Sequence, residues 1–141
     1  MVYQVSNTLE NALSLPARQY TSQSGFESEV ELLFRKKWFP VACIDLLSNP
    51  GDYLVHDHFV DEISVVRSES GKLNVFSNIC LHRACPILKG EGNVAGKCLF
   101  CPYNKWVYQL DGQLRGAPLM EQADGFIASS HQLQSVALEI W

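Results

Sequence analysis

The chain has 141 residues, of which 47% are hydrophobic and 18% are charged, and its formal net charge at pH 7 is −4. These values are typical of a globular protein with room for one domain, and they exclude an intrinsically disordered chain. The negative charge gives no reason to expect nucleic acid or an anionic membrane as a partner, and no apolar run approaches the roughly 20 residues that a transmembrane helix needs.

The cysteines and the N-terminus indicate the cellular setting. Four of the five cysteines lie between residues 80 and 101, and an odd, crowded set of this kind is more typical of metal chemistry than of a disulfide framework. Residues 1–19 contain no basic segment followed by an apolar core, so no secretory signal is predicted. We therefore expect a cytoplasmic protein.

The first 40 residues contain one clear helix signal. Residues 1–22 are of mixed composition and are predicted to form an extended arm or short helix that leads into a linker. Ser24-Gly25-Phe26-Glu27 then has the S-x-x-E form of a capping box. In the stretch that follows, acidic residues come first and basic residues last, which complements the dipole of a helix. We predict a helix over Glu27–Lys37.

The pattern changes after residue 37 to short apolar runs separated by turn residues. Turns are predicted at Asn49–Asp52, Glu69–Lys72 and Asp111-Gly112, and the last two would join hairpins. Residues 118–130 are predicted to be irregular. Many short strands without helical crossovers indicate an all-β domain, an antiparallel β-sandwich or small barrel with a short N-terminal helix. The predicted strands are Trp38–Ile44, Tyr53–Phe59, Glu62–Ser68, Leu73–Ser77, Lys97–Phe100, Trp106–Gln109, Gln113–Arg115 and Leu133–Trp141.

Two short turns carry the candidate metal ligands. Cys80-Leu81-His82 and Cys101-Pro102-Tyr103-Asn104 are separated by a little under twenty residues. Two thiols and an imidazole suit a Rieske 2Fe–2S centre, in which two Cys bind one iron and two His bind the other. Asn104 stands where the second His is expected. The aromatic residues Tyr103, Trp106 and Tyr108 are predicted to shield the site from water.

The same residues resemble a known family. The pattern N-x-C-x-H-R, followed by C-P-Y-N-K-W-x-Y-x-x-D-G-x-L-x-G-A-P, is similar to the Rieske domain of ring-hydroxylating oxygenase large subunits, which carry C-P-Y-H-G-W at the second turn. The resemblance extends over essentially all of the chain after about residue 20. It implies a Rieske-like iron–sulfur domain over residues 23–141.

This resemblance also implies an activity and partners. In that family the domain passes electrons from a ferredoxin or reductase to a mononuclear iron, which lies in a C-terminal catalytic domain and activates O₂. The chain ends at Trp141, before such a domain, so the resemblance implies a truncated oxygenase component and not a complete enzyme. A homo-oligomer is also compatible with the family.

Three residues depart from the family pattern, and all lie on the two turns. Asn104 replaces the second His, Lys105 replaces the Gly after it, and Ala84 replaces the Gly after His82-Arg83. An amide is a weaker ligand for iron than imidazole. The expected cofactor-binding residues are therefore Cys80, His82, Cys101 and Asn104, with water or Cys85 as a substitute for the fourth ligand.

Two other interpretations remain open. Cys80, His82, Cys98 and Cys101 would form a Cys₃His zinc site, although the odd spacing of Cys98 and Cys101 in a strand places them on opposite faces. Alternatively, the domain is a cluster-free structural or partner-binding module. In metal-free protein we expect Cys80 and Cys101 to lie close enough to oxidise to a disulfide, since the fold that holds two ligands of one iron brings their sulfurs together.

Overall fold

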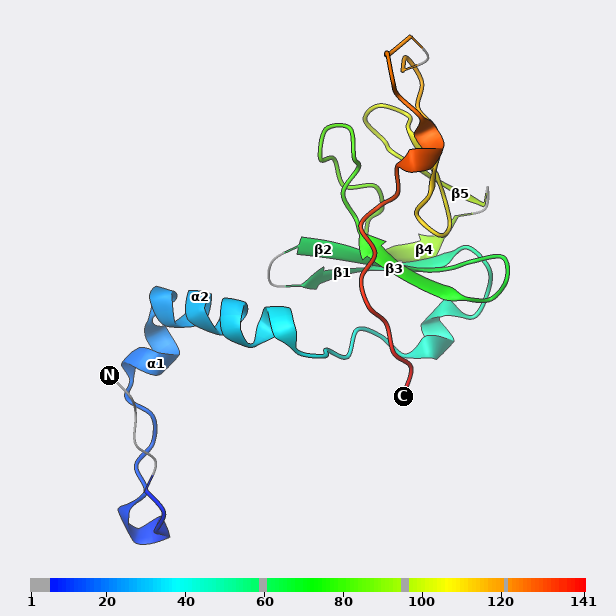
Figure 1. The fold of residues 1–141 in the computed structure, drawn as a ribbon. Helices are drawn as coiled ribbons and strands as arrows, with labels where there is room; N and C mark the ends of the chain where they lie inside the picture. The colour runs from blue at the N-terminus through cyan, green and yellow to red at the C-terminus, as the bar shows by residue number, and fades with distance from the viewer. Residues whose placement is uncertain (1–5, 59–60, 95–96, 121) are drawn as a thin grey trace. The chain divides into compact units, whose positions relative to one another are not determined.

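The computed structural model describes residues 6–58, 61–94, 97–120 and 122–141 (Figure 1). The chain divides into two compact units, Met1–Phe39 and Pro40–Trp141, which are described in turn. Within the described residues, no helix has the length and apolar character needed to cross a membrane.

The N-terminal unit contains short helices. η1 spans Leu9–Asn11, α1 spans Arg18–Thr21, α2 spans Gln23–Leu32 and η2 spans Phe34–Lys36. The N-cap of α2 is Ser22, whose Oγ accepts a hydrogen bond from the Gly25 N–H at 3.1 Å. The predicted capping box at residues 24–27 was therefore wrong, because the extended backbone that a cap needs lies two residues earlier, directly after α1. The predicted basic end falls in η2, after the helix has ended.

The second unit begins with a four-stranded antiparallel sheet of order β3-β2-β1-β4 (Figure 1). β1 spans Asp52–His58, β2 spans Asp61–Arg67, β3 spans Leu73–Ser77 and β4 spans Glu91–Asn93. The first three confirm the predicted strands to within a residue or two over the described part of the chain. The turn before β1 is also confirmed: the Asp52 N–H donates to the Asn49 carbonyl at 3.0 Å, and Gly51 has a φ of +86°.

A second, three-stranded antiparallel sheet follows, of order β5-β6-β7. β5 spans Cys98–Phe100, β6 spans Val107–Gln109 and β7 spans Leu114–Gly116. The predicted turn at Asp111-Gly112 joins the last two strands. Gly112 has a φ of +86°, and the Asp111 carboxylate accepts the Gln113 N–H at 3.0 Å. The described residues thus form a two-sheet antiparallel β domain and no closed barrel, which confirms the predicted all-β fold class with its antiparallel sheets.

Successive residues of β2 point to opposite faces of the sheet and pack into two different apolar clusters. Val66 packs into the larger cluster, whereas Val65 faces a smaller one with Leu47 and Val75. Tyr108 and Leu99, on β6 and β5, are completely buried in the larger cluster. The larger cluster therefore joins the two sheets, and its buried members are Val66, Phe76, Cys80, Ile87, Leu88, Leu99, Cys101, Trp106, Tyr108, Leu110, Leu114 and Leu133.

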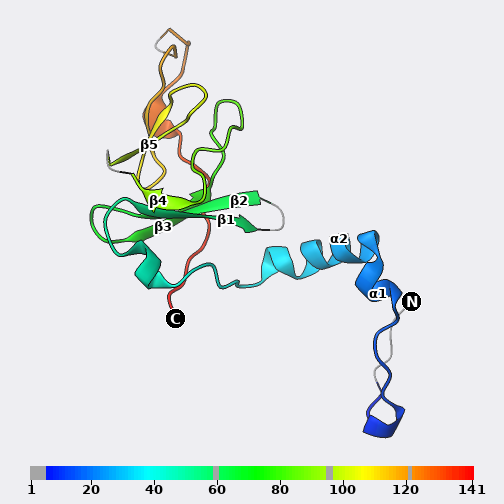
Figure 2. The same cartoon turned by 180° about the vertical axis from the view of Figure 1, so that it is seen from behind.

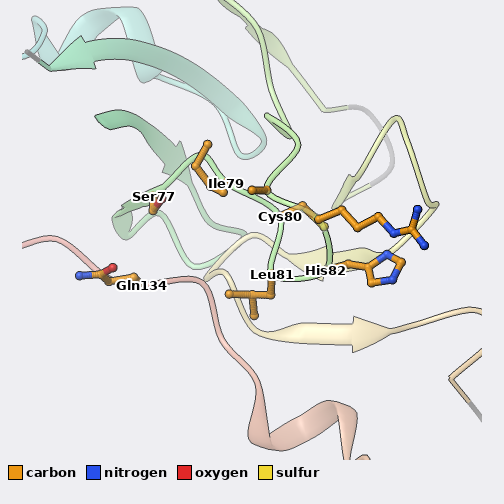
Figure 3. Close-up of a pocket in the computed structure, with 8 residues that line it drawn as sticks. Ser77, Ile79, Cys80, Leu81, His82 and Gln134 are labelled. Carbon is orange, nitrogen blue, oxygen red and sulfur yellow. The ribbon is translucent and has the colours of Figure 1, made fainter. Parts of the chain in front are cut away.

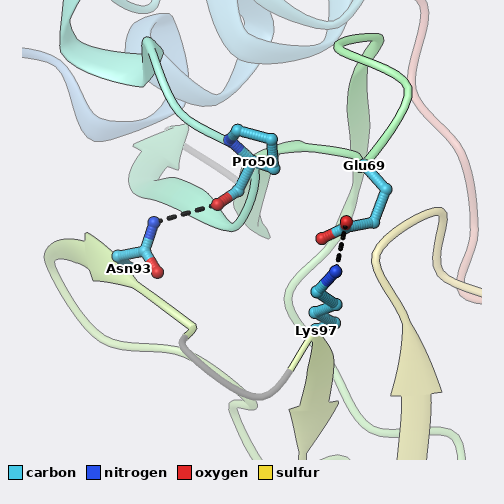
Figure 4. Close-up of polar contacts among 4 residues, drawn as sticks. All are labelled: Pro50, Glu69, Asn93 and Lys97. Atoms are coloured by element: carbon cyan, nitrogen blue, oxygen red, sulfur yellow. Dashed lines mark hydrogen bonds and ion pairs between the residues drawn. The ribbon is translucent and has the colours of Figure 1, made fainter.

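Two polar contacts fix the loops around the sheets (Figure 4). The Asn93 side chain donates to the Pro50 carbonyl at 3.1 Å, so the end of β4 is tied to the turn before β1. The Lys97 ammonium lies 2.7 Å from the Glu69 carboxylate, which links the start of β5 to the β2–β3 turn. Both groups of the ion pair are largely exposed, and such pairs contribute at most about 1 kcal/mol.

Two predicted strands are absent. Residues 38–43 are irregular and lead into the 3-10 helix η3, Ile44–Leu47, in which only Leu47 is buried. Leu133–Trp141 forms one isolated bridge, between Ser135 and Phe76, and is a strand of neither sheet. In both cases apolar residues gave a strand signal, although several of them, such as Trp38 and Ile140, are more than half exposed.

The segment 131–136, which we call the C-terminal strap, touches both sheets in turn. The Leu114 N–H donates to the His131 carbonyl and the Leu133 N–H to the Gly112 carbonyl, both at 2.9 Å. The strap then reaches β3, where a bridge pairs Ser135 with Phe76. Figures 1 and 2 both show this segment running from the β5–β7 region across the four-stranded sheet. The strap thus joins the two halves of the domain.

Candidate metal centre

The two predicted turns form loops with the same backbone frame. In the first loop, residues 80–85, the Cys80 N–H donates to the Cys85 carbonyl at 2.9 Å and the Ala84 N–H returns to the Cys80 carbonyl at 3.0 Å. In the second loop, residues 101–106, the Cys101 N–H donates to the Trp106 carbonyl at 2.9 Å and the Lys105 N–H returns at 3.1 Å. Each loop therefore presents its cysteine at the same position of an equivalent turn.

The fifth residue of each loop has a left-handed backbone. Ala84 has a φ of +53° and Lys105 a φ of +64°. A non-glycine residue pays a steric cost there, about 1–2 kcal/mol, because its Cβ approaches the following carbonyl. This explains why the family pattern has Gly at both positions. At both positions the left-handed dihedral is therefore the reason that glycine is favoured.

The two cysteines meet beneath the loops. Cys80 is 1% exposed and Cys101 is fully buried, and their thiols interact directly. The Tyr108 hydroxyl lies 3.2 Å from the Cys80 sulfur and accepts the Leu81 N–H at 3.1 Å. When the Cys80 thiol is ionised it has no proton to give, so the Tyr108 hydroxyl is then the donor of this hydrogen bond. Tyr108 was predicted only to shield the site, and the structure adds a hydrogen bond to a candidate ligand.

The surroundings make the two thiols unequal. Burial raises the pKa of the Cys80 thiol, but hydrogen bonds, of which the Tyr108 hydroxyl makes the strongest, outweigh burial and leave this pKa below its usual value. Burial is the main reason that the pKa of Cys101 lies above its usual value. Burial likewise raises the pKa of the Tyr108 hydroxyl. Cys80 is thus the member of the pair that carries negative charge more readily.

His82 and Asn104 contact each other above the thiols. The Asn104 Oδ1 accepts the Trp106 N–H at 3.1 Å, so its amide nitrogen faces the other way and contacts the Nδ1 atom of His82. The same nitrogen lies 3.7 Å from the Cys80 sulfur. The His82 ring stacks on Trp106, with 5.0 Å between ring centroids and an interplanar angle of 9°. All four predicted ligand positions therefore converge.

The donor set matches a Rieske centre at three of four positions. Two adjacent thiols and one imidazole are the ligands expected of its two irons. The Asn104 amide nitrogen has no lone pair to offer a metal, and it occupies the Nδ1 atom of His82 as a hydrogen-bond donor. As the side chains are placed, no group of three or more His, Cys, Asp or Glu residues within the described ranges is arranged to hold a metal ion.

The two possible substitute ligands have other surroundings. Cys98 is buried in β5, and its sulfur accepts a hydrogen bond from the Arg115 guanidinium at 3.2 Å. Cys85 is partly buried at the end of the first loop and packs against the larger cluster. The zinc interpretation, which needs Cys98 beside the other two cysteines, gains no support from these contacts.

The tips of the loops form an exposed surface with a cleft beside it. Arg83 of the first loop lies over the Tyr103 ring of the second, 6.0 Å from the ring centroid. Next to this contact, a cleft of about 410 Å³ opens between the first loop and the strap, with Gln134 on the strap side (Figure 3). Its lining residues are Ser77, Ile79, Cys80, Leu81, His82, Arg83, Ala84 and Gln134.

One buried residue at the site had no predicted role. Asn78 is 1% exposed and lies two residues before Cys80, where its side chain bonds to Leu88, just after the first loop. An Asn with no charged neighbours in sequence is most simply interpreted as a turn or surface residue. Only its position in the N-x-C motif could have drawn attention to it.

Known proteins are similar to this chain in sequence and fold. The model of the Rieske [2Fe-2S] domain matches residues 37–136. The carnitine monooxygenase oxygenase subunit of Escherichia coli (strain K12) is 38% identical over 130 residues, which are 92% of this chain and 34% of that protein. The chloroplastic choline monooxygenase of Spinacia oleracea is 30% identical over 94% of this chain and 30% of its own length.

A solved structure agrees with these sequence matches. The quaternary ammonium Rieske monooxygenase CntA in complex with L-carnitine superimposes with a TM-score of 0.85 at 31% identity, over 91% of this chain and 36% of that one. The chain thus spans about a third of the length of these relatives. The predicted resemblance to Rieske oxygenase subunits is confirmed. On its sequence, its two-sheet fold and its paired cysteine loops, the chain belongs to the Rieske [2Fe-2S] domain family.

Proposed function

We propose that this chain is the electron-transfer domain of a Rieske oxygenase subunit with an altered cluster site. Cys80 and Cys101 would bind one iron of a 2Fe–2S cluster and His82 the other, with Asn104 in the place of the second His ligand. The observation that carries this proposal is the convergence of the two loops, which pairs both thiols under His82. When bound, such a cluster accepts and donates single electrons.

The chain's own residues would prepare the site for this role. Tyr108 would donate a hydrogen bond to the Cys80 thiolate, and Trp106 supports the face of His82. Hydrogen bonds to sulfur and burial are both means by which a protein adjusts a cluster potential. The proposal extends to a cytoplasmic location, to a ferredoxin or reductase as electron donor, and to assembly as an oligomer with an oxygenase catalytic domain.

The names of the relatives suggest the class of substrate for the longer protein. Carnitine and choline are both quaternary ammonium compounds, and we propose this class for the oxygenase that would contain this domain. The test is the coding sequence downstream of residue 141. An open frame that supplies two His and a carboxylate for a mononuclear iron would support the proposal, and a stop codon at that point would contradict it.

Metal analysis of anaerobically purified and reconstituted protein tests the cluster. We expect about two irons and two acid-labile sulfides per chain, with a visible absorption spectrum that dithionite bleaches. Cys80→Ser should abolish it, whereas Cys98→Ser should retain it. Colourless protein without iron after reconstitution would contradict the proposal and favour a cluster-free binding module. About one zinc per chain would favour the zinc-stabilised domain instead.

A further inference from the structure

Asn78 is the only described residue of the two site loops and their flanks whose buried side chain makes four hydrogen bonds. Its Oδ1 accepts from the Ser64 hydroxyl at 2.8 Å and from the Leu88 N–H at 3.0 Å. Its Nδ2 donates to the Leu88 carbonyl at 2.9 Å and to the Glu62 carboxylate at 3.0 Å. With 1% exposure, no water is needed to satisfy this amide.

These bonds connect the first loop to β2. Ser64 and Glu62 lie on β2, whereas Leu88 follows the first loop. The Asn78 backbone adds two more contacts, since its N–H donates to the Glu62 carbonyl and its carbonyl accepts from the Ile87 N–H, both at 2.9 Å. Asn78 therefore closes the base of the segment that carries Cys80 and His82, and fastens that base to the sheet.

The second loop needs no such residue. It connects β5 and β6, so the ladder of a regular hairpin holds its two ends together. The first loop emerges from β3 and has only the isolated Ile79–Pro86 bridge between its ends. The positions of Cys80 and Cys101 relative to each other thus depend on Asn78 on one side and on strand pairing on the other.

We propose that Asn78 is a positioning residue of the metal centre. It fixes the position of the first loop relative to β2, so that the Cys80 sulfur contacts the Cys101 sulfur. The inference rests on the proposed function for its significance, but the thiol contact on which it acts exists without a metal. The two can therefore be tested apart.

Disulfide formation in the metal-free protein measures the contact between the thiols. Diamide takes up two electrons and two protons from the two thiols and becomes a hydrazine, while a bond forms between the sulfurs of Cys80 and Cys101. The initial rate is read from a non-reducing peptide map. We expect Asn78→Ala to slow this rate about tenfold, because a buried four-bond contact is lost. Asn78→Asp should slow it similarly, since a carboxylate would face the Glu62 carboxylate and the Leu88 carbonyl.

Val65→Ala is the matched control for a loss of stability alone. Val65 lies on β2 next to Ser64 but faces the smaller cluster, away from the loops. We expect this variant to unfold more easily and to form the disulfide at the unchanged rate. If Val65→Ala slows the rate as much as Asn78→Ala does, Asn78 has a merely structural role and the proposal is overturned.

Two further arms keep the outcome decisive. If Asn78→Ala does not fold, as judged by circular dichroism, Ser64→Ala replaces it, because it removes one bond to Asn78 and should slow the rate about twofold. If the folded Asn78 variants form the disulfide at the unchanged rate, the proposal is overturned. The same holds for an unchanged rate in Ser64→Ala when the Asn78 variants do not fold, and for an unaltered chain that forms no disulfide. If the rates behave as expected and reconstitution yields no iron, the proposed function fails while the positioning role stands.

Discussion

At the scale of single residues, the Tyr108 hydroxyl controls the charge of the site. In metal-free protein we expect Tyr108→Phe to raise the pKa of the Cys80 thiol, because it removes the strongest of the hydrogen bonds that lower it. Thiolate absorbance near 240 nm, followed as pH rises, should then appear at higher pH than in the unaltered chain. Tyr103→Phe removes a hydroxyl that contacts Arg83 instead and should leave the curve unchanged. Coincident curves for Tyr108→Phe and the unaltered chain would contradict this assignment.

We expect residue 104 to determine how firmly a second iron would be held at the proposed cluster site. The Asn104 amide nitrogen that contacts His82 has no lone pair for a metal. Asn104→His puts an imidazole in its place, which is a better ligand for iron. We expect reconstituted Asn104→His to retain more iron and sulfide per chain, and to lose them more slowly in air, than the unaltered chain. The matched control is Asn104→Ala, which removes the amide without adding a ligand and should retain no more iron. Equal retention in the His and Ala variants would show that residue 104 does not face the metal.

The residues of the site were predictable to different degrees. Cys80, His82, Cys101 and position 104 were found because their spacing is set by the turns that present them. The roles of Tyr108 and Asn78 as hydrogen-bonding residues were not, because each acts on a partner that only the fold brings near. The partner of Tyr108 is 28 residues away in sequence, and the farthest partner of Asn78 is 16 residues away.

At the scale of elements, the paired loops carry local strain that glycine would relieve. Ala84→Gly and Lys105→Gly should each stabilise the fold by about 0.5–1 kcal/mol, since the left-handed backbone costs an alanine or lysine more than glycine loses in entropy. Urea unfolding at equilibrium measures the change.

Ala137→Gly is the control for these loop variants. Ala137 is exposed and lies outside the set of residues with positive φ, so glycine there brings only its entropic cost and should not stabilise the chain. Loss of stability in both loop variants as well would show that the loops are not strained.

The sequence predicted elements best where turn chemistry and apolar alternation coincide. Leu73–Ser77 was located to the residue between a Gly turn and the first loop. β4 was missed because Glu91, Gly92 and Asn93 are all exposed and offer no apolar signal. Its pairing with β1 depends on backbone bonds and on the Asn93 side chain, which donates to the Asp52 carboxylate at 2.7 Å. The helix start was misplaced because Ser22 and Ser24 have equal capping chemistry, and only the preceding turn of helix selects between them.

At the scale of the whole molecule, Leu133 anchors the strap between the sheets. Its side chain is 1% exposed in the larger cluster, where it packs close to Gly112. Leu133→Ala should lower the free energy of unfolding by about 2–5 kcal/mol, the cost of a cavity at a well-packed site. Thermal or urea unfolding provides the measurement. Leu119→Ala, at a residue 93% exposed, should change it by no more than about 0.5 kcal/mol. Similar losses of unfolding free energy in both variants would mean that Leu133 does not anchor the strap.

The strap also determines how the domain would respond to mechanical load. At its C-terminal side the strap is hydrogen-bonded to β3, through the Val136 and Ser77 N–H groups. Nearer its N-terminal side it is hydrogen-bonded to the β6–β7 turn and to β7, through the Leu133 and Leu114 N–H groups. A force applied at the C-terminal side of the strap would break these hydrogen bonds one after another, before it acted on the hydrogen bonds between strands. The strap would therefore come away while both sheets were still intact, and the cluster between them would lose Leu133.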